Sequence, residues 1–131
     1  MADIIVADDE EAVRTFITRY LEQAGHHVIA ARDGTEVLSI IESQNVDAVI
    51  LDILMPEKEG LETLIELRQR GKAFPIITIS GGSGSQNSDY LELSEKLGAN
   101  CSLQKPFSGE ALVTALGQLL LQTKDSAEEP A

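Results

Sequence analysis

The sequence predicts one α/β domain in which a parallel five-stranded sheet is covered by helices on both faces. Five short apolar runs alternate with stretches of helical periodicity, which is the pattern of consecutive βα units. Of the residues, 43% are hydrophobic but only 4% are aromatic, so the core must consist mainly of Ile, Leu, Val and Ala, as in a buried parallel sheet. With 131 residues, the chain has the length of one ordinary domain. We therefore predict a three-layer, doubly wound sandwich.

The first two strands are predicted at 4–7 and 28–31. Between them, apolar residues recur at helical spacing, and Gly25 ends this helix. The apolar stripe of the helix consists of Ala12, Val13, Phe16, Ile17, Tyr20 and Leu21. A second helix follows Asp33, which is placed to cap its first turn. The stripe of this second helix consists of Val37, Leu38, Ile40 and Ile41.

The third and fourth strands are predicted at 48–51 and 76–79. A loop at 53–59 and a helix after Gly60 connect them, and Gly71 marks the end of this helix. The apolar stripe of the helix consists of Leu61, Leu64, Ile65 and Leu67.

The last two units differ from the others in their composition. Segment 81–88 is rich in Gly and Ser and predicts a flexible loop. The next helix has a thin apolar stripe, so we expect it to be the most mobile; the stripe consists of Tyr90, Leu91, Leu93 and Leu97. A fifth strand follows at 101–104, and Ser108 can cap the final helix. We place the domain at 1–122, and we expect the acidic segment 123–131 to be disordered because it lacks apolar anchors.

Charge and cysteine content limit the possible environments and partners. The formal net charge of −12 argues against direct binding of nucleic acid, which requires clustered Lys and Arg. The single cysteine, Cys101, cannot form an internal disulfide, which is compatible with a reducing compartment. No apolar run approaches the roughly 20 residues of a membrane span, and the first residues lack the basic start of a signal peptide. We expect a soluble cytoplasmic protein that does not contact membranes.

Three carboxylates follow apolar runs and are the most informative feature of the chain. Asp8 and Asp9 come after the first predicted strand, and Asp52 comes after the third. The carboxyl ends of parallel strands form the ligand crevice of such sheets, so these acids are expected to converge. Two carboxylates about 5 Å apart repel each other by about 3 kcal/mol at an effective dielectric constant of about 20. Such a cluster requires a cation, a proton or a function.

Further residues at strand ends give the chain a resemblance to a known family. Taken in order along the chain, these residues resemble the motifs of the receiver domain of two-component response regulators, in its stand-alone, chemotaxis-type form. The resemblance covers residues 3 to about 122. The residues that carry the resemblance are Asp8-Asp9, Asp52 followed by Met55-Pro56 and Gly60, Ser80-Gly81, and Lys105-Pro106-Phe107. The resemblance implies a flavodoxin-like (βα)5 fold with strand order 2-1-3-4-5.

The chemistry of these residues suits phosphoryl transfer. An aspartate carboxylate can act as the nucleophile, and Asp52 is the candidate phosphoacceptor because it stands alone after its strand. Asp8 and Asp9 are candidates to hold Mg²⁺ or Mn²⁺, because hard cations prefer oxygen ligands. Lys105 would place a positive charge near the phosphoryl oxygens, and Ser80 would donate a hydrogen bond to them.

Finer details follow from the resemblance alone. It implies that Asp9 is the closer metal ligand, that Asp8 acts largely through water, and that Asp52 and the main-chain carbonyl of Leu54 complete the set. It also implies a cis peptide bond between Lys105 and Pro106. The expected partners are a histidine kinase or histidine phosphotransfer protein as donor and a downstream effector protein. The chain would be a phosphoacceptor that assists its own phosphorylation and dephosphorylation, not a conventional enzyme.

Each residue also has a structural interpretation, and two other functions stay open. Asp8 and Asp9 can cap a helix, Asp52 can belong to a turn, Ser80 can begin a loop, and Lys105 can be a surface charge. Only the joint pattern favours a site. An aspartyl-phosphate phosphatase would need a second Asp where Leu54 stands. A receiver-like interaction module that is never phosphorylated is the other alternative, because Ser102 occupies a position that in the family usually holds Tyr or Phe.

Three other residues are interpreted as structural. His26 and His27 are adjacent, so on an extended segment they point in opposite directions, and we assign them to a turn. Cys101 is expected to be a small buried apolar residue.

Overall fold

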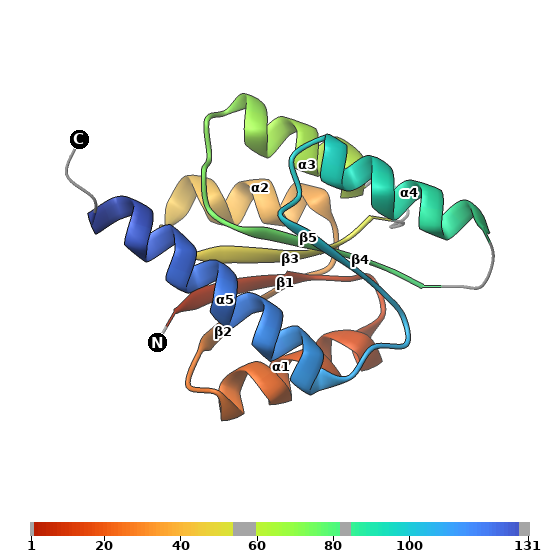
Figure 1. Cartoon of the computed structure of the whole chain (residues 1–131), viewed down its shortest axis with the longest axis horizontal. Coiled ribbons are helices and arrows are strands. Elements are labelled where there is room, and N and C mark those ends of the chain that lie inside the picture. Colours follow the sequence, from red (N-terminus) through yellow and green to blue (C-terminus); the bar gives the residue numbers. More distant parts are fainter. Residues whose placement is uncertain (1, 54–59, 82–84, 129–131) are drawn as a thin grey trace.

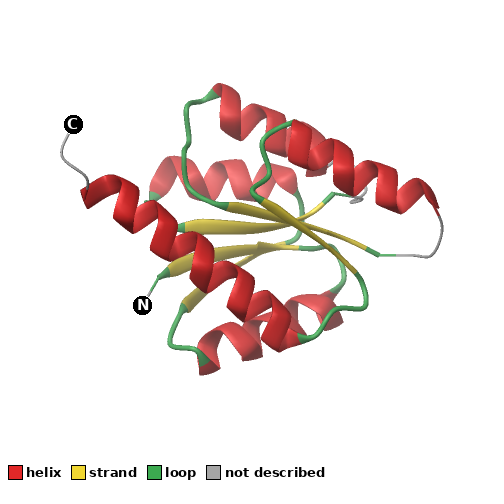
Figure 2. Ribbon diagram, in the orientation of Figure 1, coloured by secondary structure: helices red, strands yellow, loops and turns green. Residues whose placement is uncertain are grey.

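The computed structural model describes residues 2–53, 60–81 and 85–128, without the side chains of 85–88 and 123–128. Strands and helices alternate along the described chain, and Figure 2 shows the strands as a central layer between helices. The elements are β1 (Asp3–Ala7), α1 (Glu11–Gln23), β2 (His27–Ala31), α2 (Gly34–Ser43), β3 (Ala48–Asp52), α3 (Gly60–Gln69), β4 (Ile76–Ser80), α4 (Ser85–Lys96), β5 (Cys101–Gln104) and α5 (Gly109–Glu128).

The five strands form one parallel sheet in the order β2-β1-β3-β4-β5. The predicted flavodoxin-like (βα)5 fold is therefore confirmed. Each predicted strand lies within one residue of its observed bounds. The continuous apolar runs of β1, β3 and β4 are explained by this order, because these inner strands are covered on both faces.

The sheet separates two apolar cores. Figure 1 shows α1 and α5 on one face of the sheet and α2, α3 and α4 on the other. Alternating residues of β1 serve the two faces: Ile4 and Val6 pack with residues of α1 and α5, whereas Ile5 and Ala7 pack with residues of α2 and α3. A one-residue shift of β1 would therefore exchange its contributions to both cores.

Local signals in the sequence define several helix ends as predicted. The Asp33 carboxylate accepts a hydrogen bond from the backbone N–H of Glu36 at 2.9 Å and caps α2. The Ser108 hydroxyl accepts from the backbone N–H of Ala111 at 3.0 Å at the start of α5. Gly25 and Gly71 have φ angles of 94° and 79°, a backbone conformation that favours glycine after a helix.

Two helices extend beyond the segments predicted for them. Helix α4 begins at Ser85, inside the segment 81–88 that was predicted as a loop, because the polar residues that begin it give no periodic apolar signal in the sequence. Helix α5 continues past residue 122 to Glu128, and the domain boundary at 122 stays a prediction. No Gly or Pro interrupts the chain between Gln122 and Glu128, so the helix can propagate past its apolar stripe.

Smaller differences concern single residues. His27 is the first residue of β2, not a turn residue, and its ring Nδ1 lies 3.1 Å from a carboxylate oxygen of Asp3. His26 precedes the strand, and its Nδ1 accepts from the backbone N–H of Ala2 at 3.2 Å. Cys101 is only half-buried on β5, where burial and the nearby charge of Glu95 raise the pKa of its thiol.

None of the helices within the described residues is both long enough and apolar enough to cross a membrane.

We predict that Gly60→Ala destabilises the protein while Gly117→Ala does not. A Cβ at Gly60 would overlap the backbone oxygen of Asp52 and the Cα of Ile53. The clash should lower the free energy of unfolding by about 2–3 kcal/mol. A Cβ at Gly117 meets nothing within 4 Å, so alanine there should raise it by about 0.5–1 kcal/mol. Urea unfolding measures both; equal stability of the two variants would contradict the prediction.

Candidate functional site

The carboxyl ends of four neighbouring strands carry the polar residues singled out in the sequence. Asp8 directly follows β1, Asp52 ends β3, Ser80 ends β4, and Lys105 directly follows β5. The strand order makes these ends adjacent, and the backbone N–H of Lys105 donates to the backbone oxygen of Ser80 at 2.8 Å. Because β1, β3 and β4 are almost entirely buried, this edge concentrates polar groups next to the core.

The ammonium group of Lys105 lies among three carboxylates. Its Nζ is 2.8 Å from Oδ2 of Asp8, 3.4 Å from Oδ2 of Asp52 and 3.7 Å from Oε1 of Glu10. A lysine ammonium has three protons to donate, so one group can serve several acceptors. Lys105 therefore supplies the cation that the clustered acids need.

Asp8 is fully buried, and both its side chain and its backbone oxygen accept hydrogen bonds. Its Oδ1 accepts from the backbone N–H of Glu10 at 2.8 Å, and its backbone oxygen accepts from Nη1 of Arg14 at 2.5 Å. The sequence allowed Asp8 and Asp9 as helix caps, but the residue before α1 is Glu10, and it makes no side-chain cap. Asp8 instead closes the short turn between β1 and α1.

The environment of Lys105 favours its charged form. Burial by itself lowers the pKa of a lysine, but the hydrogen bond to Asp8 and the charges of Asp52 and Asp8 outweigh burial, and the pKa ends above its ordinary value of 10.5. A raised pKa in the folded state stabilises the protein below the ordinary lysine pKa. This stabilisation is lost only as the pH rises through the raised folded value, so it is present at neutral pH.

Three acidic side chains meet the geometric requirement for a cation. One oxygen each of Asp8, Asp9 and Glu10 lie within 4.8 Å of one another, and Asp9 and Glu10 are exposed to solvent. All the donors are carboxylate oxygens, which suit a hard cation such as Mg²⁺. Sequence reasoning did not select Glu10, although the run Asp8-Asp9-Glu10 was a signal for it. The predicted carbonyl ligand Leu54 lies outside the described residues.

Ser80 and Gly81 line the same edge. The Ser80 side chain is buried, and its hydroxyl lies 3.4 Å from the backbone oxygen of Gly81, a long contact that a better acceptor can replace. A Cβ at Gly81 would lie 3.1 Å from Cδ of Lys105, so glycine leaves room for the lysine stem.

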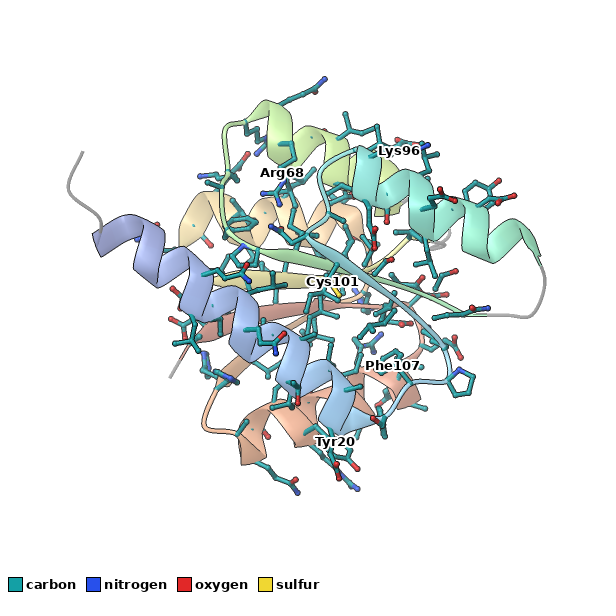
Figure 3. The ribbon with its side chains drawn as sticks, in the orientation of Figure 1. Tyr20, Arg68, Lys96, Cys101 and Phe107 are labelled. Atoms are coloured by element: carbon teal, nitrogen blue, oxygen red, sulfur yellow. The ribbon has the colours of Figure 1, made fainter. Side chains whose placement is uncertain are left out.

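The Lys105-Pro106 peptide bond is cis, which confirms the expectation from the resemblance. After it, the ring of Phe107 contacts that of Phe16 at a centroid distance of 6.3 Å; Figure 3 shows Phe107 before the start of α5.

Comparison with known proteins decides the family. The family described as response regulator receiver domain matches residues 4–117 of this chain. This protein belongs to the response regulator receiver domain family. The predicted resemblance to the receiver domain family is therefore confirmed.

Individual relatives agree with this assignment. The response regulator MprA of Mycobacterium tuberculosis is 39% identical over 131 aligned residues, covering 98% of this receiver domain chain and 55% of MprA. The CAI-1 autoinducer sensor kinase/phosphatase CqsS of Vibrio cholerae is 39% identical over 110 residues, or 84% of this chain and 16% of CqsS. The chain thus spans about half of one relative and a small part of the other. The solved receiver domain of Francisella response regulator 1452 has a TM-score of 0.84 at 30% identity, covering 94% of this chain and 99% of that one.

We predict that Lys105→Met lowers the free energy of unfolding by about 2–4 kcal/mol, because it leaves the buried carboxylate of Asp8 without its cation. Lys96→Met is the matched control, since Lys96 is exposed on α4 and should change stability by less than about 0.5 kcal/mol. Urea unfolding at neutral pH measures both. A Lys105→Met protein as stable as the control would show that the ammonium does not stabilise the acids.

Proposed function

We propose that this receiver domain accepts a phosphoryl group on the carboxylate of Asp52. The observation that carries the proposal is the position of the Lys105 ammonium, 3.4 Å from Asp52 and 2.8 Å from Asp8. A phosphoryl group in transfer spreads negative charge over its equatorial oxygens, and a fixed cation beside the nucleophile stabilises that charge.

In this reaction, a carboxylate oxygen of Asp52 forms a bond to phosphorus while the bond from phosphorus to the donor atom breaks. With a phosphohistidine donor the broken bond is P–N, and the imidazole leaves with the electron pair and takes up a proton. The product is an acyl phosphate on Asp52. Ser80 then has a new acceptor for its hydroxyl within the site, in place of the long contact to Gly81.

The carboxylates at the end of β1 are suited to a divalent cation. We assign Asp8, Asp9 and Asp52 to Mg²⁺ or Mn²⁺, together with the carbonyl of Leu54, and the oxygen cluster within 4.8 Å supports the first two. The bound cation would offset the negative charge of the acids and of the phosphoryl oxygens. Both oxygens of Asp8 already have protein partners, Lys105 and the N–H of Glu10, which favours a role through water for Asp8 and direct ligation by the exposed Asp9.

The proposed donors are a histidine kinase or a histidine phosphotransfer protein, and the proposed output is a changed affinity for an effector protein. The names of two relatives support a place in such a pathway, since MprA is named as a response regulator and CqsS as a sensor kinase/phosphatase. The chain would be a phosphoprotein of a two-component system or phosphorelay, working in the cytoplasm. It would act as a switch that assists its own phosphorylation, without turning over a separate substrate.

We predict that the intact mass of the chain increases by one phosphate after incubation with MgCl₂ and acetyl phosphate. Asp52→Asn should abolish the adduct because an amide cannot form the acyl phosphate. Asp47→Asn, which removes a charge just before β3, at its opposite end from Asp52, should retain it. An adduct on the Asp52→Asn protein would move the acceptor elsewhere. No adduct on any of the three proteins would instead favour an interaction module that is never phosphorylated.

Mg²⁺ should also stabilise the folded chain. A ligand at about ten times its Kd adds about 1.4 kcal/mol to the free energy of unfolding, so the melting temperature should rise with added MgCl₂ and return with EDTA. Asp9→Asn should remove most of this rise, whereas Asp47→Asn should preserve it. Differential scanning fluorimetry measures the shifts. If Asp9→Asn responds to MgCl₂ as strongly as the parent, the cation does not bind through Asp9.

A further inference from the structure

The connection between β1 and α1 carries the two acids assigned to the cation, and it is short. Asp8 follows β1 directly, and α1 begins at Glu11. Figure 1 shows the chain leaving β1 and turning back into α1. We call residues 8–10 the acid turn. The acid turn must reverse the direction of the chain and at the same time hold its carboxylates where a cation can reach them.

The first residue of the acid turn is fixed at three places. The backbone N–H of Asp8 donates to the backbone oxygen of Ala31, the last residue of β2, at 3.2 Å. Its carboxylate accepts from the ammonium group of Lys105. Its backbone oxygen accepts from Nη1 of Arg14, in the first turn of α1, at 2.5 Å. Of these contacts, only the one with Arg14 acts on the carbonyl that leads into Asp9.

The contact with Arg14 therefore fixes the peptide unit between Asp8 and Asp9. A peptide unit is planar, so its carbonyl and the N–H of the next residue turn together as one body. When this unit rotates, ψ of Asp8 and φ of Asp9 both change, and these two angles set where the Asp9 carboxylate lies relative to β1. A guanidinium group that holds the Asp8 carbonyl thus restricts the directions open to Asp9, although it does not touch that side chain.

The charge of Arg14 has the opposite effect on a cation. Within the described part of the chain, no carboxylate lies within ion-pair distance of the Arg14 guanidinium, which donates to a neutral carbonyl instead. The pKa of Glu36 on α2 is lowered, chiefly because Glu36 accepts hydrogen bonds from Arg32, and the charge of Arg14 is a smaller cause. A positive charge beside the acid turn repels a bound divalent cation. The hydrogen bond and the charge of Arg14 can therefore be separated by experiment.

We propose that Arg14 is a positioning residue of the cation site, whose hydrogen bond to the Asp8 carbonyl keeps the acid turn in its cation-binding conformation. The inference rests on the proposed function, because it requires that the acid turn holds the cation used in the phosphorylation of Asp52. Arg14 carries only donors, so it cannot be a ligand and acts through Asp8 and Asp9. Contacts that orient a metal ligand change metal affinity by about 10- to 100-fold. Because Ala31 also holds the acid turn, we expect the lower value.

The test is the affinity of the chain for Mn²⁺, measured by the loss of the electron paramagnetic resonance signal of free Mn²⁺. The proteins are the parent, Arg14→Met, Arg14→Lys, Arg19→Met and Asp9→Asn. Arg19→Met is the matched control, because Arg19 is exposed on the same helix and its replacement removes the same charge without touching the acid turn. Asp9→Asn removes the proposed ligand and should abolish most of the binding.

Arg14→Met should weaken Mn²⁺ binding about tenfold, even though it removes a positive charge from the neighbourhood of the cation. Arg14→Lys keeps the charge and a donor on a shorter side chain, so it should recover part of the lost affinity. Arg19→Met should bind at least as tightly as the parent, since it changes the charge alone. A role of Arg14 through its charge alone predicts the reverse order, with Arg14→Met binding more tightly than the parent.

The conformation of the acid turn is measured separately, without metal. The amide resonance of Asp9 in a ¹H–¹⁵N spectrum reports on the peptide unit whose carbonyl Arg14 holds, so Arg14→Met should shift it more than Arg19→Met does. Urea unfolding in EDTA should show that both variants are folded. An Arg14→Met chain that is unfolded in EDTA would assign Arg14 to the stability of the fold and overturn the positioning role.

The remaining outcomes separate this inference from the proposed function. If Arg14→Met binds Mn²⁺ as tightly as the parent or more tightly, the positioning role is overturned and the cation site is intact. Weaker binding with an unshifted Asp9 resonance also overturns it, because the acid turn would not have moved. If the parent does not bind Mn²⁺, or if Asp9→Asn binds it as tightly as the parent, the proposed cation site is wrong and the inference falls with it.

Discussion

The site depends on one electrostatic constraint, the placement of the Lys105 ammonium against Asp8 and Asp52. The strand order brings acids from the ends of β1 and β3 to one edge of the sheet, beside strands that are fully buried. Without a cation these acids would repel each other and pay for burial. Lys105, directly after β5, supplies that cation, at 2.8 Å from Asp8 and 3.4 Å from Asp52. The same arrangement places a fixed positive charge beside Asp52, the proposed phosphoacceptor.

The fold was predictable because the inner strands are apolar runs, which must be covered by helices on both faces of the sheet. Residues such as Ile5 and Ile50 leave no alternative to burial, and Asp33 and Ser108 mark helix starts by hydrogen bonds within four residues. The start of α4 and the length of α5 were not predictable, because helical turns without apolar residues carry no periodic signal in the sequence. Ser85 begins one helix among polar residues, and α5 continues to Glu128 through a polar stretch of the sequence.

The candidate site was predictable in its members and less so in its contacts. Asp8, Asp52, Ser80 and Lys105 could be selected because each stands at the end of a predicted strand. Glu10 was missed because an acid at the exposed start of a helix is common without any function. The partner of Ser102 was also beyond sequence reasoning, because its contact with Glu95 depends on how α4 lies across β5. What was a departure from the family pattern in sequence becomes one half of a specific contact in the structure.

The central claim is that Lys105 and Asp8 stabilise one another, and a double-mutant cycle measures this directly. The parent, Asp8→Asn, Lys105→Met and the double variant are unfolded with urea at neutral pH, and the coupling free energy is taken from the four stabilities. The account predicts a favourable coupling above about 1 kcal/mol, since residues that share a buried ion pair are not additive. Additive effects within about 0.3 kcal/mol would contradict it, because the ammonium would then not be bound to the buried acid.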